Sequence, residues 1–246
     1  MMSADFITVL WKELKEILLE RSGGSGGARP LILIAVVGIF VPLRMGPLRF
    51  FNAQGLLFPT FFGAVVITAV IADSFAGERE RHTLETLLAS RLSDRSILFG
   101  KIAASVVYGW SVSLSCVLAG AFAVNVANWQ GKVLMFHDTA SWLILSLGPP
   151  LLGGLVATAG VLVSLRATTV RQAQQTLAVA LVVAIFLMIF GSDRLPADWK
   201  SWFARILLTW SPTDLVLAAA GVLLAIDVAL LLAGMARFQR AKLVLD

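Results

Sequence analysis

One acidic residue stands in the middle of a long apolar run. Asp227 lies within residues 215–236, which hold no other charged side chain. A charge at the centre of a membrane span costs about 2.5–3.5 kcal/mol on insertion scales, so such a residue is a functional candidate. Asp227 could bind a cation, accept a proton, or hydrogen-bond a neighbouring helix while protonated. No basic residue falls at a matching depth, so the sequence offers no ion-pair partner.

The most informative charged segment runs from Asp73 to Lys101, DSFAGERERHTLETLLASRLSDRSILFGK. Leu84, Leu87 and Leu88 form a narrow apolar stripe at i, i+3 and i+4 within it. A short helix with such a stripe is suited to docking in a groove of a soluble partner, although a solvated loop is the commoner meaning of such a charge run. Ser93 or Asp94 is placed to cap the following helix, and Lys101 is expected to snorkel at its end.

The third apolar run is the most polar of the chain. Tyr108 and Ser111 lie in it, and with Asp227 they are the candidates for lining a transport pathway. Serine is also a common packing residue in membrane bundles, as is glycine. The favoured function of Gly153, Gly154 and Gly160 is therefore close helix packing.

Residues for several other chemistries are missing or scattered. Gly100-Lys101 is followed by Ile102, so it is not the phosphate-binding loop of an ATPase. The two histidines fall on opposite sides of the predicted membrane, and the single Cys116 lies in an apolar run. The sequence therefore predicts no metal site, no disulfide framework and no ATPase on this chain.

The composition indicates a membrane protein. Of 246 residues, 58% are hydrophobic and 14% charged, and the mean hydropathy is +0.86. Soluble domains carry roughly 25% charged residues, so lipid is the expected solvent. The net charge of +5 forms no basic stripe, which argues against a nucleic-acid partner.

The fold class predicted is all-α and polytopic, with six transmembrane helices. The first run, 31–43, is short for the roughly 20 residues a span needs, and it reaches across only if it continues through Phe51. The other predicted spans are residues 56–76, 97–126, 142–165, 176–190 (beginning near Ala173) and 215–236.

Basic residues set the orientation. With the N-terminus in the cytoplasm, fourteen of the twenty Lys and Arg residues lie in cytoplasmic segments and six in outer ones. This bias favours both termini inside and an even number of spans.

Residues 1–29 are expected to form an N-terminal unit ahead of the transmembrane domain, 30–246. Residues 4–20 have apolar positions on one face and charged residues, Glu13 among them, on the other. We predict an amphipathic helix in the membrane interface, the alternative being a helix packed on other protein. A glycine-rich joint follows at 22–27.

An aromatic segment, about 193–212, precedes the last span. It carries Trp199, Trp202, Phe203 and Trp210, largely at helical spacing. Pro196 suits a helix start, and Ser211 to Asp214 suit a capped restart. This pattern predicts an aromatic helix that lies in, or dips into, the outer membrane interface as an anchor.

The segment after the second run resembles the signature of the ABC-2 type exporter permeases. The resemblance rests on Glu78-Arg-Glu80, Thr83-Leu84-Glu85, Leu87-Leu88, Ser93, Ile97 and Gly100-Lys101. It implies a cytoplasmic coupling helix, about 78–92, that contacts an ATP-binding subunit. It also implies that the aromatic segment is a re-entrant outer gate, the alternative being the plain interfacial anchor. The partner-binding residues it implies are Glu78, Glu80, Thr83, Leu84, Glu85, Leu87 and Leu88.

The resemblance further implies a permease in the cytoplasmic (inner) membrane that exports a substrate. It implies no cofactor on this chain, ATP and Mg on the partner subunit, and a second permease copy, identical or related, with membrane lipid around the bundle. A stand-alone secondary transporter using Asp227 is the alternative. An integral membrane enzyme of lipid metabolism is a weaker one, because the chain lacks clustered acids, histidines or a nucleophile at one membrane face.

Overall fold

The computed structural model describes residues 2–22, 32, 34–129, 135, 137–191 and 196–237, and every regular element in these ranges is a helix. The all-α prediction is therefore confirmed for the described part of the chain. The elements are α1 (Met2–Ser22), the π-helix η2 (Val36–Phe40), α3 (Val41–Met45), α4 (Pro47–Phe50), α5 (Ala53–Glu80), α6 (Leu84–Ala89), α7 (Asp94–Ala127), α8 (Thr139–Ser164), α9 (Val170–Gly191), α10 (Ala197–Thr209) and α11 (Pro212–Arg237).

Four helices are long and apolar enough to cross a membrane. They coincide with the second, third, fourth and sixth predicted runs, at Gly55–Glu80, Asp94–Ala127, Thr139–Ser164 and Pro212–Met235. α9 covers the fifth predicted run, but several of its last side chains lie outside the described residues. The described residues thus support a multi-pass membrane protein, and the count of six spans stays a prediction.

The first predicted run does not continue as one helix through Phe51. α3 ends at Met45 because Gly46 adopts φ +76°, a conformation that glycine takes without strain, and Pro47 then starts the separate α4. Upstream, Pro42 cannot donate a hydrogen bond to the preceding turn, and a π-helical turn lies directly before it. The described helix is therefore too short to span a bilayer by itself.

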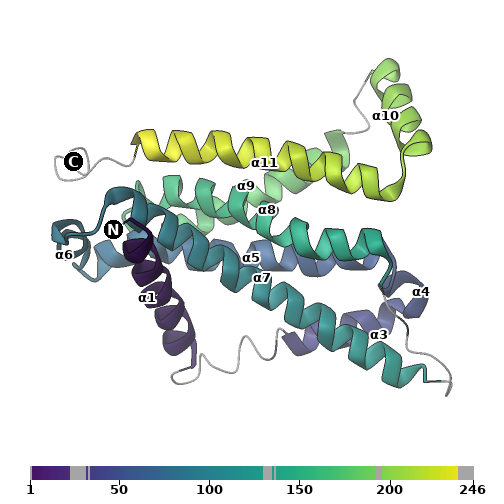
Figure 1. Ribbon diagram of the computed structural model, residues 1–246, viewed down its shortest axis with the longest axis horizontal. Helices are drawn as coiled ribbons and strands as arrows, with labels where there is room; N and C mark the ends of the chain where they lie inside the picture. Colours follow the sequence, from purple (N-terminus) through teal and green to yellow (C-terminus); the bar gives the residue numbers. More distant parts are fainter. Residues whose placement is uncertain are drawn as a thin grey trace.

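α5 forms the centre of the bundle and contacts α7, α8 and α9, while α11 packs along α8 and α1 along α7 (Figure 1). Ile67 and Ile71 of α5 fill the space beside three glycines, Gly109 on α7 and Gly153 and Gly160 on α8. A Cβ atom at any of these would collide with an isoleucine. The predicted close-packing function of Gly153 and Gly160 is confirmed.

The bundle has two ends of different character. The start of α1 and the last described turn of α11 lie at the end that carries α6, here called the α6 end (Figure 1). α10 stands off the opposite end, the α10 end. Pro196 directly precedes α10, and Ser211 and Asp214 exchange hydrogen bonds at the start of α11, as predicted.

Candidate functional site

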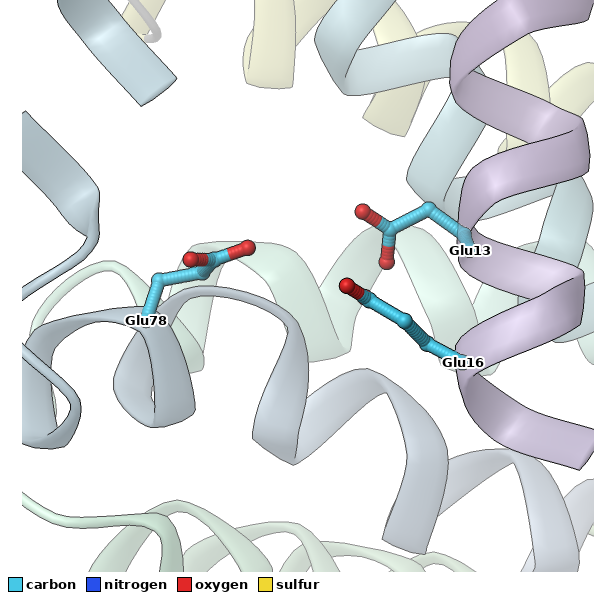
Figure 2. Close-up of side chains that lie close together, drawn as sticks. All are labelled: Glu13, Glu16 and Glu78. Carbon is cyan, nitrogen blue, oxygen red and sulfur yellow. The ribbon is translucent and has the colours of Figure 1, made fainter. Parts of the chain in front are cut away.

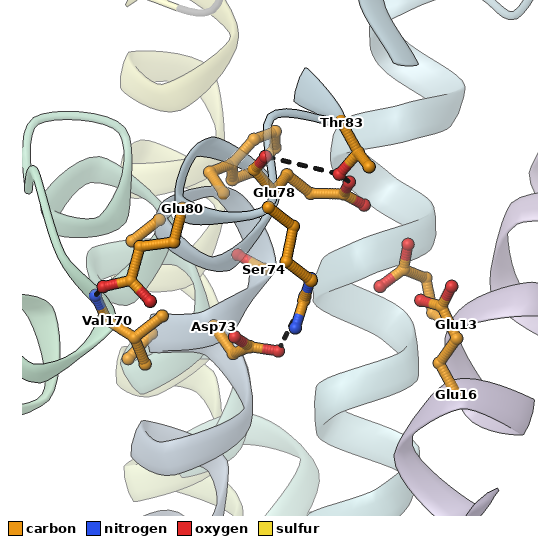
Figure 3. A network of polar contacts seen from close by, with 12 residues as sticks. Glu13, Glu16, Asp73, Ser74, Glu78, Glu80, Thr83 and Val170 are labelled. Carbon is orange, nitrogen blue, oxygen red and sulfur yellow. Dashed lines mark hydrogen bonds and ion pairs between the residues drawn. The ribbon is translucent and has the colours of Figure 1, made fainter. Parts of the chain in front are cut away.

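Two side chains in the last turn of α5 bind the backbone of the segment that connects α8 to α9. Arg79 donates from Nη2 to the carbonyl oxygen of Leu165 at 2.9 Å and from Nη1 to that of Ala167. The Oε1 atom of Glu80 accepts the backbone N–H of Val170 at 2.8 Å, at the start of α9 (Figure 3). A cation after the end of one helix and an anion at the start of the next satisfy free backbone groups and match the helix dipoles.

The Glu78 carboxylate connects three further elements. Its Oε1 atom lies 3.4 Å from Nζ of Lys101 on α7 and 3.4 Å from Nζ of Lys12 on α1. Its Oε2 atom accepts a hydrogen bond from the hydroxyl of Thr83, which caps α6 (Figure 3). The Thr83 N–H also donates to the Glu78 carbonyl at 2.9 Å. We call Glu78, Arg79, Glu80, Thr83, Lys101, Glu13 and Lys12 the charged junction.

Lys101 is buried, so the prediction that it snorkels is wrong. Its side chain is 1% exposed, and Nζ lies 2.8 Å from Oε1 of Glu13 and 5.4 Å from the ring centroid of Phe75. The side chain lies two turns inside α7, where α1 and α5 cover it, and a buried ammonium needs carboxylates. Glu13, assigned by periodicity to a solvated face, is buried for the same reason.

α1 contacts the bundle through Val9 and Glu13 and leaves part of its apolar face exposed. Val9 fills the space beside Gly100 on α7, where a Cβ atom would collide with it. Ile7, Trp11 and Leu18 are 61%, 71% and 59% exposed. Both sequence interpretations thus have support, since α1 packs on protein and keeps a free apolar edge. Its place in a membrane interface stays a prediction.

A polar cavity of about 290 Å³ opens beside the charged junction between α1, α5, α7 and α9. Carboxylate oxygens of Glu13, Glu16 and Glu78 lie within 4.8 Å of one another there, as Figure 2 shows. Lys101 and Lys12 neutralise much of this charge. Burial alone would lower the pKa of Lys12, but Glu13, Glu78 and Glu16 raise it above its ordinary value.

The segment predicted to be a coupling helix, 78–92, is not one continuous helix. α5 continues through Glu80, and α6 covers only Leu84–Ala89, after a turn in which His82 has φ 55°. Glu78 and Glu80 therefore belong to α5.

The apolar stripe of α6 turns largely inward. Leu84 and Leu87 pack partly buried against the core of the bundle, and Glu85 and Thr86 are exposed. The side chain of Leu88 lies outside the described residues. The predicted contact of this helix with a partner stays a prediction, and its described free face is polar.

The three candidate pathway residues lie on different surfaces. Asp227 is buried with its carboxylate against Gly154 of α8, and among the described residues its Oδ1 atom has no hydrogen-bond partner. Tyr108 packs on a cluster around Cys116, and the Ser111 hydroxyl donates to the Val107 carbonyl of its own helix. The structure therefore does not assemble them into one site.

The aromatic residues at the α10 end are exposed. Trp199 and Trp202 meet edge to face with ring centroids 6.4 Å apart, and Trp210 is also exposed. The side chain of Phe203 lies outside the described residues. The choice between interfacial anchor and gate stays open.

Comparison with known proteins agrees with the sequence motif. A family model described as ABC-2 family transporter protein matches residues 45–236, from the end of α3 through nearly all of α11. No curated protein and no solved structure matches the chain. The chain therefore belongs to the ABC-2 type transporter permeases and is a transmembrane subunit of such a transporter.

Proposed function

We propose that this chain is the permease subunit of an ABC exporter in the cytoplasmic membrane. A separate ATP-binding subunit would bind and hydrolyse ATP with Mg, and this chain would itself be non-catalytic. Two permease copies, identical or related, would enclose the pathway. The α6 end would face the cytoplasm, in agreement with the distribution of basic residues along the sequence.

The charged junction is the single observation that carries this proposal. Thr83 begins α6 and hydrogen-bonds the side chain of Glu78, whose carboxylate contacts Lys101 on α7 and Lys12 on α1. The next two residues, Arg79 and Glu80, bind the turn between α8 and α9. A displacement of α6 would therefore reach four other helices through a few charged contacts.

The buried ion pair between Glu78 and Lys101 favours joint movement of α5 and α7 over separation of the two helices. The Lys101 and Glu78 side chains are 1% and 9% exposed. Separating a buried ion pair leaves uncompensated charges in a medium of low polarity, which costs about 3–5 kcal/mol. Helix α7 is therefore expected to follow α5 when a partner moves α6. ATP-driven closure of two soluble subunits would thereby tilt the helices around the pathway.

The partner-binding surface in this proposal is the exposed face of α6. Glu85 and Thr86 project from it, whereas Leu84 and Leu87 hold the helix to the bundle. Partner contacts would thus be largely polar, and the leucines would keep α6 attached while it is moved.

Co-purification tests the proposal. The chain is isolated in mild detergent from the cells that naturally produce it. We expect an ATP-binding chain to accompany it, and Glu85→Arg with Thr86→Arg to reduce that recovery at least fivefold. Asp198→Arg reverses an exposed charge on α10 and is the matched control. Equal recovery with both variants, or none with the unaltered chain, would contradict the proposal.

Asp227 supports one alternative, a secondary transporter. Its buried Oδ1 atom has no hydrogen-bond partner in the described part of the chain, so it could accept a proton or contact a cation. Transport that continued without any ATP-binding chain but stopped in Asp227→Asn would establish this function instead.

A further inference from the structure

A second cavity lies away from the charged junction and has only α1 and α7 in common with the first cavity as lining helices. It has a volume of about 810 Å³ and lies between α1, α7, α8 and α11. Small-molecule sites typically occupy about 300–1,000 Å³, so the cavity is large enough for a ligand. Phe99 and Val106 of α7, Leu231 of α11 and Phe6 of α1 contribute to its apolar lining. We call it the apolar groove.

The length of the apolar groove matches one leaflet of a bilayer. Along α7 its lining runs from Arg95 to Val106, which corresponds to about 16 Å at 1.5 Å per residue. The hydrocarbon core is about 30 Å thick, so one leaflet contributes about 15 Å. Its inner part is bounded by Pro150 and Gly154 of α8, both within the membrane-spanning segment. The groove thus has the depth of a single extended acyl chain.

Arg95 lies at the α6 end of the apolar groove and is exposed. Within the described part of the chain, it has no ion-pair or hydrogen-bond partner. Lys101, Arg79 and Arg81 at the same end each have a partner in the protein, and the exposed Arg91 does not line the groove. An unpaired guanidinium at the mouth of an apolar groove complements an anionic head on an apolar tail.

We propose that the apolar groove is a binding site for an anionic phospholipid of the leaflet at the α6 end. The phosphate would contact Arg95, and one acyl chain would run along α7 toward Gly154. Acyl chains are already in apolar surroundings in the bilayer, so the headgroup decides the selectivity. One arginine near the surface favours an anionic lipid about fivefold.

Native mass spectrometry of the full-length chain tests this site. The protein is delipidated and reconstituted with equal amounts of phosphatidylglycerol and phosphatidylcholine. It is then released from the bilayer, and the mass of the complex identifies the lipid that stays bound. We expect about a fivefold excess of phosphatidylglycerol on the unaltered chain. Arg95→Gln should abolish this preference while some lipid is still retained. Arg171→Gln, an exposed arginine outside the groove, is the matched control and should behave as the unaltered chain.

Filling the groove gives an independent readout. Ala103 lies in its lining, and Ala103→Trp should lower retention of both lipids. Ala103→Leu is the milder version, used if the tryptophan variant unfolds. Equal losses in Arg95→Gln and Arg171→Gln would overturn the proposal in favour of general surface attraction. Unchanged lipid retention when the groove is filled would overturn it too, and a simultaneous shift from dimer to monomer would identify a second copy as the occupant.

Discussion

The chain buries charged side chains in two places, which differ in whether the charge has partners. At the α6 end, Lys101 contacts the carboxylates of Glu13 and Glu78, and every partner comes from another helix. In α11, Asp227 is equally hidden from solvent but has an oxygen atom without a partner and lies against the bare backbone of Gly154. A buried charge on α7 with partners on α1 and α5 fixes the relative positions of the three helices. A buried acid whose oxygen atom has no partner does not fix neighbouring helices in this way. It is therefore available for a ligand or a proton.

Loss of Lys101 should have the largest effect. Lys101→Met keeps the length of the side chain but leaves Glu13 and Glu78 without their buried partner. We expect the free energy of unfolding to fall by about 3–5 kcal/mol, because the two buried carboxylates then keep only the half-exposed Lys12 as a partner. Reversible unfolding in mixed detergent measures the loss.

Lys15 supplies the matched control for that variant. It is exposed on α1, so Lys15→Met should change the unfolding free energy by no more than about 0.5 kcal/mol. Adding Glu13→Gln and Glu78→Gln to Lys101→Met should recover part of the stability. Similar unfolding of the Lys101 and Lys15 variants would show that the charged junction does not hold the helices together.

Asp227→Asn should have a much smaller effect on stability, less than about 1 kcal/mol, because no ion pair is lost. The side chain keeps its size beside Gly154. The same unfolding assay measures this change. A loss comparable to that of Lys101→Met would mean that Asp227 has a structural partner and would remove the contrast between the two sites.

The smallest effect concerns pH at the α10 end. Burial lowers the pKa of His137 below its ordinary value of 6.5, although the Phe51 carbonyl and Asp138 oppose the shift. His137 therefore binds a proton more readily in the unfolded chain than in the folded chain. Its contribution to the free energy of unfolding is complete above about pH 6.5 and declines as the pH falls toward the folded pKa. Unfolding measured from pH 7.5 to 5 should show this decline.

His137→Phe should flatten that pH dependence. His82→Asn is the control, since His82 is exposed in the turn before α6 and asparagine tolerates its positive φ. An unchanged slope in His137→Phe would assign the pH dependence to other groups.

Hydropathy correctly predicted the positions of four spans. Residue types and motif spacing predicted the cap at Ser211, a cap at Ser93 or Asp94 that the structure places at Ser93, and the family. They failed where long-range contacts decide the outcome. Lys101 looked like a snorkelling residue because the helix that buries it lies some ninety residues earlier in the sequence. The polar face of α1 looked solvated because Glu13 has no partner within its own segment. A lysine two turns inside an apolar helix was the available signal.

The contacts of the Glu78-Arg79-Glu80 motif likewise could not be predicted from the sequence. The motif identified the segment, but nothing in it shows that its three side chains reach three different places. The leucine stripe of α6 illustrates the same limit, since periodicity reveals an apolar face without telling whether it meets a partner or the chain's own core.

Hydrogen exchange in the complex with the ATP-binding subunit tests the coupling account most directly. Addition of a non-hydrolysable ATP analogue should change backbone protection both in α6, Leu84–Ala89, and in α1, Met2–Ser22. In Glu78→Gln the change should remain in α6 and be lost from α1, because the carboxylate that pairs with Lys101 and Lys12 is gone. Equal changes in α1 with and without Glu78, or no change in α6, would contradict the account.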